Sequence, residues 1–230
     1  MWELCVSRYR IAGVCYACFC AWSRQINRCC NTCGRADLEL GLCQNPLCNR
    51  DRWYDRNITI SYREGVLHNR MDAYKFNGRR GWALIFARIL LGFMNANVQT
   101  FQGYDLIIAN PAYPPGQAAT SDTGRVLSIA SQIDQYAWPF DGIPQAIEKR
   151  QPTTSMKGKG WQQRAQIAET ELRAALAIPN RQRTEGHRVL VYDDLYTTGH
   201  TLNEVARCLI NVGGARQVTG ISLARQLRGT

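Results

Sequence analysis

Two adjacent carboxylates precede a turn rich in threonine and glycine in the stretch VLVYDDLYTTGHTL, residues 189–202. Asp193 and Asp194 repel each other, so their pairing favours a partner that both can bind. In open α/β sheets, ligands bind beyond the carboxyl ends of the strands, and the apolar run before Asp193 would place the pair at such an end. Carboxylates there can accept hydrogen bonds from the vicinal hydroxyls of a sugar and can help to hold a divalent cation.

The turn after the acidic pair is suited to an anion. Backbone N–H groups in such a turn, with the N-terminus of the following helix behind them, form a binding site for a phosphate. Threonine hydroxyls add donors, and Gly199 lets the backbone approach closely. The other interpretation is a strand end followed by a capped turn. We expect a sugar with both a phosphate and a diol, bound by Asp193, Asp194, Tyr196, Thr197, Thr198, Gly199, His200 and Thr201.

Cysteine pairs near the N-terminus are spaced for metal ligation. Eight of the ten cysteines lie between Cys15 and Cys48, and such close pairs favour metal ligation in a reducing cytoplasm over a disulfide framework. Cys30-x2-Cys33 and Cys43-x4-Cys48 suit a tetrahedral four-cysteine zinc ribbon. The zinc would be structural, because four thiolates leave no open coordination position.

The cysteine pattern leaves alternatives open. Cys29 could replace Cys30 in the main site, and Cys15-x2-Cys18 could hold a second zinc together with Cys20 or Cys29. Buried thiols that bind no metal are the other interpretation of either site.

Composition indicates one large domain with a small appendage. The chain has 230 residues, is 45% apolar and carries a formal net charge of +10, which predicts attraction to nucleic acid, a membrane face or a phosphorylated ligand. Arg50, Arg52, Trp53, Tyr54 and Arg56 interleave charge with aromatic rings, as in proteins that hold single-stranded nucleic acid. The alternative is a hinge between the ribbon and the main domain.

A membrane span is not expected. The apolar run at 82–94 is too short to cross a bilayer and contains Arg88. Arg8 and Arg10 before the apolar run at 11–22 imitate a signal peptide, but three cysteines would be unusual in its core.

Strands and helices alternate after about residue 52, which predicts a parallel α/β sheet. The polar, basic stretch at 151–160 predicts a mobile loop. The predicted strands are 57–64, 104–110, 188–194 and 218–225. The predicted helices are 68–97, broken near Asn77-Gly78, then 123–137, 161–176 and 200–213, with Gly213 as the last C-cap.

The acidic pair and its turn resemble the signature of type I phosphoribosyltransferases: apolar residues, two acidic residues, then a Thr/Gly loop. The P-loop pattern and a strand-following GxGxxG are absent. The resemblance implies that Asp193 and Asp194 bind the ribose hydroxyls of phosphoribosyl pyrophosphate, accompanied by Mg2+, and that the turn binds the 5-phosphate. Relatives acting on hypoxanthine or guanine usually have a carboxylate where Thr197 stands, which argues against 6-oxopurine salvage.

The order of features along the chain resembles ComF-like proteins, especially their actinobacterial amidophosphoribosyltransferase-like branch. A cysteine cluster is followed by Tyr62-Arg63, by YKFNGRR at 74–80, by a strand with a proline loop, and by the signature. Such proteins carry a zinc ribbon before a phosphoribosyltransferase domain, and several are linked to DNA uptake. The resemblance implies a pyrophosphate loop at Asn110, Pro111, Ala112 and Tyr113, although the usual RGFNQ segment is replaced by SDTGRVLSIASQ.

The basic loop at 151–160 supplies candidate catalytic cations. Phosphoribosyl transfer passes through an oxocarbenium-like state as pyrophosphate leaves with its metal, and a loop that brings cations over the leaving group would assist it. Lys157 and Lys159 are the candidates. A solvated basic loop is the alternative.

These features predict an α/β fold with a type I phosphoribosyltransferase-like parallel sheet at 53–230, behind a cysteine-rich zinc-ribbon region at 1–52. We expect a cytoplasmic glycosyltransferase that moves the phosphoribosyl group to an unidentified acceptor, with Asp193, Asp194, Lys157 and Lys159 in catalysis. The alternative is a non-catalytic ComF-like factor that senses the ligand, or binds single-stranded DNA with the uptake machinery in competence.

Overall fold

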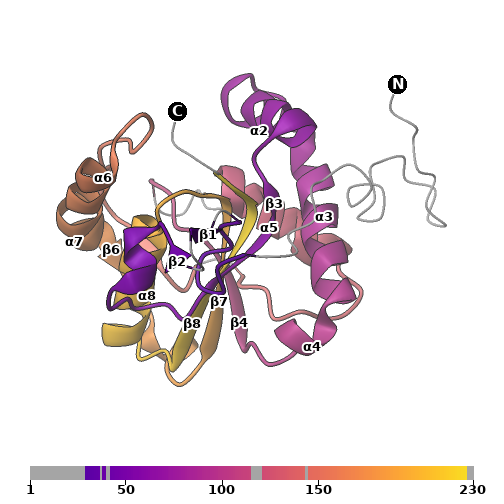
Figure 1. The fold of residues 1–230 in the computed structure, drawn as a ribbon. Helices are drawn as coiled ribbons and strands as arrows, with labels where there is room; N and C mark the ends of the chain where they lie inside the picture. Colours follow the sequence, from indigo (N-terminus) through magenta and orange to yellow (C-terminus); the bar gives the residue numbers. More distant parts are fainter. Residues whose placement is uncertain (1–28, 37, 40–41, 115–120, 143–144, 227–230) are drawn as a thin grey trace.

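A four-stranded parallel sheet forms the centre of the protein in a computed structural model, which describes residues 29–36, 38–39, 42–114, 121–142 and 145–226 (Figure 1). All three neighbouring pairs run parallel, which confirms the predicted α/β class. The strands lie in the order β3 (Asn57–Tyr62), β8 (Gln217–Arg225), β7 (Arg188–Tyr196) and β4 (Leu106–Ala109).

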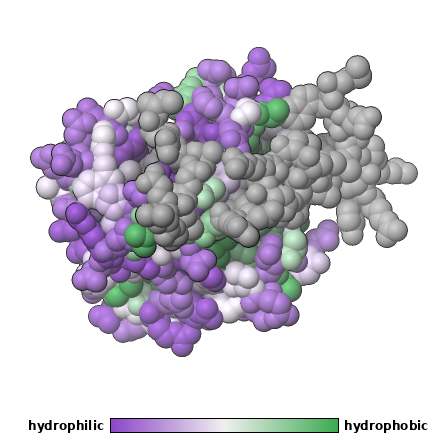
Figure 2. Space-filling model, viewed as in Figure 1, coloured by the Kyte–Doolittle hydropathy of each residue, from purple (hydrophilic) through white to green (hydrophobic). Residues whose placement is uncertain are grey.

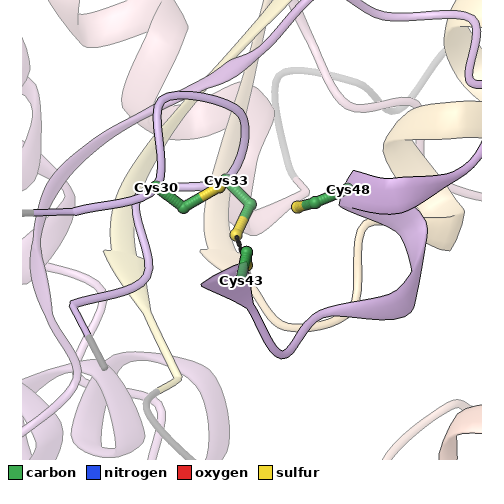
Figure 3. A group of neighbouring side chains, drawn as sticks. All are labelled: Cys30, Cys33, Cys43 and Cys48. Carbon is green, nitrogen blue, oxygen red and sulfur yellow. Dashed lines mark hydrogen bonds between the residues drawn. The ribbon is translucent and has the colours of Figure 1, made fainter. Parts of the chain in front are cut away.

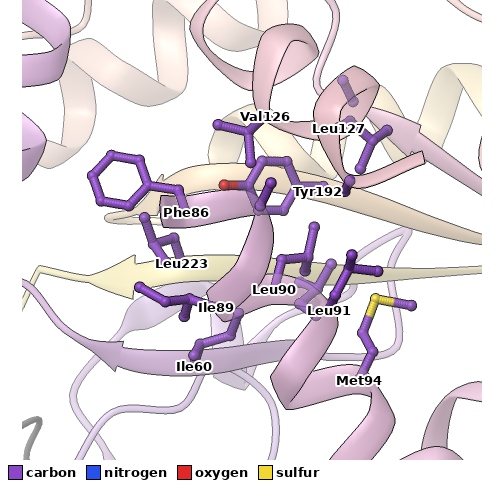
Figure 4. Packing of buried hydrophobic residues seen from close by; sticks show 14 of the residues in the cluster. Ile60, Phe86, Ile89, Leu90, Leu91, Met94, Val126, Leu127, Tyr192 and Leu223 are labelled. Carbon is purple, nitrogen blue, oxygen red and sulfur yellow. The ribbon is translucent and has the colours of Figure 1, made fainter. Parts of the chain in front are cut away.

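Helices cover both faces of this sheet (Figure 1). Apolar side chains of all four strands and of the helices on the first face interlock in one buried cluster, in which Ile60, Tyr192 and Leu223 meet residues such as Phe86 and Leu90 (Figure 4). That face carries α2 (Gly65–Phe76), α3 (Trp82–Ala96), α4 (Val98–Phe101) and α5 (Asp122–Ile133). The second face carries α8 (His200–Asn211) and the cysteine region, which share a second cluster.

A mainly helical segment between two short strands, β5 (Glu148–Lys149) and β6 (Leu176–Ala177), projects from the second face of the sheet. β5 pairs antiparallel with β6, so the segment 150–175, which begins with the loop at 151–160, starts and ends at the same place. The predicted helix at 161–176 consists of three parts: α6 (Trp161–Ile167), a π-helical segment η3 (Ala168–Leu172) and α7 (Arg173–Ala175). The short helix η4 (Arg181–Arg183) leads into β7.

Two local predictions differ from the structure, and one is confirmed. Helix α2 ends before Gly78, which has a φ of 65°, so the predicted break is confirmed. Gly213 is not the C-cap of α8: the cap is Val212, and the left-handed glycine is Gly214. Strand β7 also runs on to Tyr196, so the acidic pair lies inside the strand instead of ending it.

The cysteine region packs directly on the sheet. It consists of a tight turn at 30–35, strands β1 (Leu38–Glu39) and β2 (Leu42–Cys43), and the 3-10 helix η1 (Pro46–Asn49). Gly34 has a φ of 69° and lies so close to Thr59 that a Cβ would collide with it, while its carbonyl accepts a hydrogen bond from the Tyr62 hydroxyl. The predicted boundary between residues 52 and 53 stays a prediction.

The described surface is mainly hydrophilic on the face shown in Figure 2, where hydrophobic areas are small and separate. Large exposed apolar side chains include Leu42, Phe76 and Tyr136. In the part of the chain that the structure describes, no helix has the length and apolar character needed to cross a membrane.

Candidate functional site

The acidic pair lies where strand β7 extends past its neighbour. Strand β4 ends at Ala109, opposite Tyr192, while β8 continues alongside β7 up to Tyr196. One edge of β7 is therefore free of strand pairing at Asp193 and Asp194, and Asn110, just after β4, reaches Asp193 there.

The two carboxylates have different partners, because alternate residues of a strand face opposite sides of the sheet. Asp194 Oδ2 lies 2.6 Å from Lys75 Nζ, which extends from the last turn of α2. Asp193 Oδ2 accepts a hydrogen bond of 3.2 Å from Asn110 Nδ2, and its Oδ1 accepts one of 2.9 Å from the backbone N–H of Asp194. These separate partners reduce the repulsion between the two carboxylates that the sequence predicts.

The electrostatics of the pair are unequal. Desolvation, and then the charge of Asp194, raise the pKa of Asp193 to about 7, against the opposing effects of Lys75 and Asn110. Burial alone would lower the pKa of Lys75, but the charge and hydrogen bond of Asp194 outweigh burial and raise it. Asp194 and Lys75 thus form an ion pair. The pKa of Asp193 lies near neutral pH, so a bound ligand can change its protonation.

Lys75 was not identified from the sequence, although it lies in the quoted segment YKFNGRR. That segment was noted only for its resemblance and received no chemical role. A lysine in the last turn of a helix is ordinarily solvated or interacts with the helix dipole. Only the packing of α2 against the sheet shows that this one meets Asp194.

The turn between β7 and α8 is built around Gly199, which has a φ of 93°. A Cβ at this position would lie 2.2 Å from the Tyr196 hydroxyl oxygen and 2.7 Å from that of Tyr54. The two tyrosine hydroxyls are hydrogen-bonded to each other at 2.6 Å. Backbone conformation and close packing therefore both require glycine here, and the turn leads directly to the N-terminus of the 12-residue helix α8.

The Gly199→Ala variant is expected to lose about 1–3 kcal/mol of stability through its left-handed backbone, and more through the collision with Tyr196 and Tyr54. Thermal unfolding measures the loss. Gly186→Ala is the matched control, because Gly186 has a φ of 74° but open space around it. Equal losses in the two variants would show that the tyrosine packing adds nothing.

Thr197 and Thr201 in the turn contact the segment between β5 and β6. Arg164 Nη1 donates a hydrogen bond of 2.9 Å to Thr197 Oγ1, and the Thr201 hydroxyl donates to Met156 Sδ at 3.5 Å. Thr197 stands where relatives acting on hypoxanthine or guanine usually have a carboxylate, and its hydroxyl is held by a hydrogen bond from Arg164.

His200 is buried at the start of α8 and stacks edge-on against Trp161, with ring centroids 4.8 Å apart. Burial, followed by the charge of Arg164, lowers the pKa of His200 to about 4. The imidazole is therefore neutral near pH 7, and an anion in the turn would meet the backbone N–H of His200 rather than a cationic ring.

The proline loop after β4 lies beside the acidic pair through its first residue. Asn110 donates its backbone N–H to the Tyr192 carbonyl at 2.8 Å, and its own carbonyl accepts a hydrogen bond from Thr123 Oγ1. Pro111 is buried, Ala112 is half-buried and Tyr113 is exposed. Asn110 is thus the member of the predicted pyrophosphate loop that contacts Asp193, and the roles of the other three stay predictions.

The contacts recorded for the two candidate loop lysines are with Phe76 and Arg164, and their catalytic role stays a prediction. Lys157 Nζ lies 3.7 Å from the centroid of the Phe76 ring, next to Lys75 in sequence. Lys159 is exposed, and its carbonyl accepts a hydrogen bond from Arg164 Nε. The loop thereby extends from the first turn of α8 to the last turn of α2. Among the described residues, the cation that contacts the acidic pair is Lys75, which pairs with Asp194.

Four cysteine side chains converge in the N-terminal region (Figure 3). The Sγ atoms of Cys30, Cys33, Cys43 and Cys48 all lie within 4.8 Å of one another, and those of Cys33 and Cys43 are 3.6 Å apart. A tetrahedral zinc with Zn–S bonds of about 2.3 Å needs sulfur separations of about 3.8 Å. The group contains Cys30 and not Cys29, and the predicted second pair, Cys15 and Cys18, lies outside the described residues.

A buried cation beside the cysteines supports a charged metal centre. Arg225 is 3% exposed, and its Nε and Nη1 atoms have no hydrogen-bond partner among the described residues. Its guanidinium stacks on the Tyr196 ring and contributes to the low pKa of Cys33, about 5, which arises chiefly from a hydrogen bond with Cys48. Zinc with four thiolates carries two negative charges, so Arg225 would be its counter-ion.

Comparison with known proteins finds a family match for the C-terminal part of the chain. Residues 147–230 match the model of the phosphoribosyl transferase domain. The chain contains a phosphoribosyltransferase domain. The match includes the acidic pair, the glycine turn and the loop at 151–160, whereas Lys75, Asn110 and the four cysteines precede it.

Two curated relatives of this phosphoribosyltransferase-domain protein are competence proteins named ComFC. The one from Bacillus subtilis (strain 168) is 49% identical over 41 residues, which are 18% of this chain and 17% of the relative. The one from Streptococcus pneumoniae is 23% identical over 182 residues, which are 75% of this chain and 72% of the relative. Similarity to ComFC therefore extends over most of the chain, as the order of motifs predicted.

Proposed function

We propose that the protein binds phosphoribosyl pyrophosphate with Mg2+ and transfers its phosphoribosyl group to an acceptor. The observation that carries this proposal is the position of Asp193 and Asp194 on an unpaired strand edge, directly before a glycine turn at the N-terminus of α8. A diol-binding pair beside a phosphate-binding turn matches a ribose 5-phosphate.

Each part of the site has a distinct role in this proposal. The two carboxylates accept hydrogen bonds from the ribose 2- and 3-hydroxyls, and the N–H groups of Thr197 to Thr201 bind the 5-phosphate. Asn110 lies beside Asp193 on the edge where the pyrophosphate would extend. Lys75 pairs with Asp194 and orients its carboxylate. Mg2+, when bound, would neutralise charge on the leaving pyrophosphate.

In the transfer, the bond between ribose C1 and the pyrophosphate oxygen breaks, and the acceptor nucleophile forms a new bond to C1. Positive charge develops on the ribose ring as pyrophosphate departs. The loop at 151–160 reaches both α8 and α2 through Met156 and Lys157, so it can cover the reacting groups and exclude water.

Calorimetry with phosphoribosyl pyrophosphate and Mg2+ tests the proposal. We expect saturable binding with one site per chain, competition by ribose 5-phosphate and dependence on Mg2+. Pyrophosphate release with a defined acceptor would establish transfer. The proposal fails if neither phosphoribosyl pyrophosphate nor ribose 5-phosphate binds at millimolar concentration, which corresponds to about 4 kcal/mol or less of binding free energy.

Binding is expected to strengthen as the pH rises from about 6 to about 8, by at most tenfold per pH unit, because the ligand needs Asp193 ionised and its pKa is about 7. Calorimetry in buffers with different ionisation enthalpies should show a proton released on binding below that pKa. Asp193→Asn is the control, since its residual pH dependence reports only the titration of the ligand's own phosphates. The same pH slope in both proteins would contradict the assignment.

A second candidate is a non-catalytic role in competence, favoured by the names of the two relatives. The segment predicted to bind single strands exposes 41% of Trp53. Arg50 and Arg52, however, stack on Trp161 and Tyr54 within the molecule, as a hinge would. Salt-sensitive binding of single-stranded DNA that survives Asp194→Asn would support this candidate.

A further inference from the structure

Asn45 joins the cysteine cluster to the glycine turn, which lies 153 residues later in the sequence. Its side-chain Nδ2 donates a hydrogen bond of 3.2 Å to the backbone carbonyl of Thr198. Asn45 is 4% exposed. A buried contact between the N-terminal region and the predicted phosphate turn is not implied by either motif alone.

The same residue is held on the cysteine side by both members of the second cysteine pair, Cys43 and Cys48. Its backbone N–H points to Cys43 Sγ at 3.4 Å. Its side-chain Oδ1 accepts the Leu47 N–H and caps the short helix η1, which carries Cys48. The position of the Asn45 amide group therefore depends on where Cys43 and Cys48 are fixed.

The contact controls a peptide group that a phosphate would meet. The peptide between Thr198 and Gly199 is planar and trans, so its N–H points opposite to its carbonyl. A hydrogen bond from Asn45 to the Thr198 carbonyl therefore also orients the N–H of Gly199. A turn that binds anions requires its N–H groups to be held in place before the ligand arrives.

Two further contacts attach the residues just after the cluster to the same structure. The Tyr54 hydroxyl bonds to that of Tyr196, at the end of β7. The Trp53 backbone N–H donates to Asn203 Oδ1 in the first turn of α8, at 2.9 Å. The strand end, the turn and the helix start are each held from the N-terminal side.

We propose that Asn45 is a positioning residue through which the four-cysteine zinc site orders the phosphate-binding turn. The zinc and the phosphoribosyl ligand then bind cooperatively: zinc orders the turn for the ligand, and the ligand slows the loss of zinc by the same coupling. This inference rests on the proposed function for the identity of the ligand, but the ordering of the turn does not depend on it.

Asn45→Ser separates the two halves of this connection. Serine retains an acceptor that caps η1 but is too short to reach the Thr198 carbonyl. Asn49→Ser is the matched control, because Asn49 Nδ2 donates to the Cys43 carbonyl, a hydrogen bond that lies within the cysteine region. Both variants are expected to bind one zinc per chain, measured by metal analysis.

Amide hydrogen exchange of residues 197–201 is the primary readout and needs no ligand. In the zinc-loaded proteins we expect exchange to become about 3- to 10-fold faster in Asn45→Ser, the effect of losing one hydrogen bond, and to stay unchanged in Asn49→Ser. Affinity for phosphoribosyl pyrophosphate should fall by a similar factor in Asn45→Ser alone. The ligand should slow zinc transfer to a chelator in the wild-type chain and not in Asn45→Ser.

Equal exchange rates in Asn45→Ser and the wild-type chain would overturn the inference. If Asn45→Ser does not fold, Asn45→Asp replaces it, since it keeps the Oδ1 acceptor that caps η1 and removes the Nδ2 donor to the Thr198 carbonyl. Faster exchange at 197–201 in Asn45→Asp supports the inference, and unchanged exchange refutes it. Faster exchange without any ligand binding in the wild-type chain would leave the connection standing and refute the proposed function.

Discussion

Asp194→Asn is expected to unfold at a lower temperature than the wild-type chain and to bind phosphoribosyl pyrophosphate about 10- to 100-fold more weakly. The binding loss corresponds to one charged hydrogen bond, about 1.5–3 kcal/mol. The stability loss arises because Lys75, whose side chain is only 25% exposed, is left without its partner. Breaking one side of a buried pair costs about 3–5 kcal/mol, less where solvent reaches the charge.

The neighbouring substitution Asp193→Asn should act on stability in the opposite direction. The pKa of Asp193 is raised to about 7 in the folded chain from its ordinary 3.8. Asp193 ionises less readily in the folded chain than in the unfolded chain. The folded chain therefore loses stability progressively as the pH rises from about 4 to about 7. Asp193→Asn should raise the melting temperature near pH 8 and change it much less near pH 4, while ligand binding is weakened.

Melting curves of both variants at the two pH values, with calorimetric titrations, measure these effects. The double variant Lys75→Met with Asp194→Asn is the control: it should recover much of the stability and none of the ligand binding. Destabilisation of both single variants to the same degree would contradict the different environments that we assign to the two carboxylates.

Cys30→Ser is expected to abolish zinc binding and to unfold the cysteine region, because structural zinc supplies folding free energy of about 10 kcal/mol or more in small sites. It also leaves buried Arg225 without the negative charge that would balance it. The adjacent variant Cys29→Ser should retain one zinc and a near-normal melting temperature, since Cys29 is not in the converging group.

Metal analysis and thermal unfolding with and without a chelator distinguish the two variants. Chelation should lower the melting temperature of the wild-type and Cys29→Ser proteins and should not affect Cys30→Ser further. Retention of zinc by Cys30→Ser with loss from Cys29→Ser would reverse the assignment of the ligand.

Sequence patterns were sufficient to predict the parts of the candidate site that consist of residues close together in the chain. The acidic pair, the glycine turn and the two cysteine pairs are all short segments whose residue types and spacing carry the information. The strands were likewise predictable, because β7 and β8 are apolar runs buried on both faces of a parallel sheet. The extension of β7 past Asp194 was not, since it depends on pairing with β8 as far as Tyr196.

The sequence by itself determined the fold class and the four-cysteine group, and it predicted phosphate and diol binding for residues 193–201. Only the tertiary structure decided which cation meets Asp194, that Cys30 and not Cys29 joins the cluster, and that Asn45 contacts the glycine turn. The reason is physical. A motif encodes interactions along a few residues of backbone, whereas the contacts of Lys75 and Asn45 exist only because packing on the sheet brings together side chains that lie far apart in the chain.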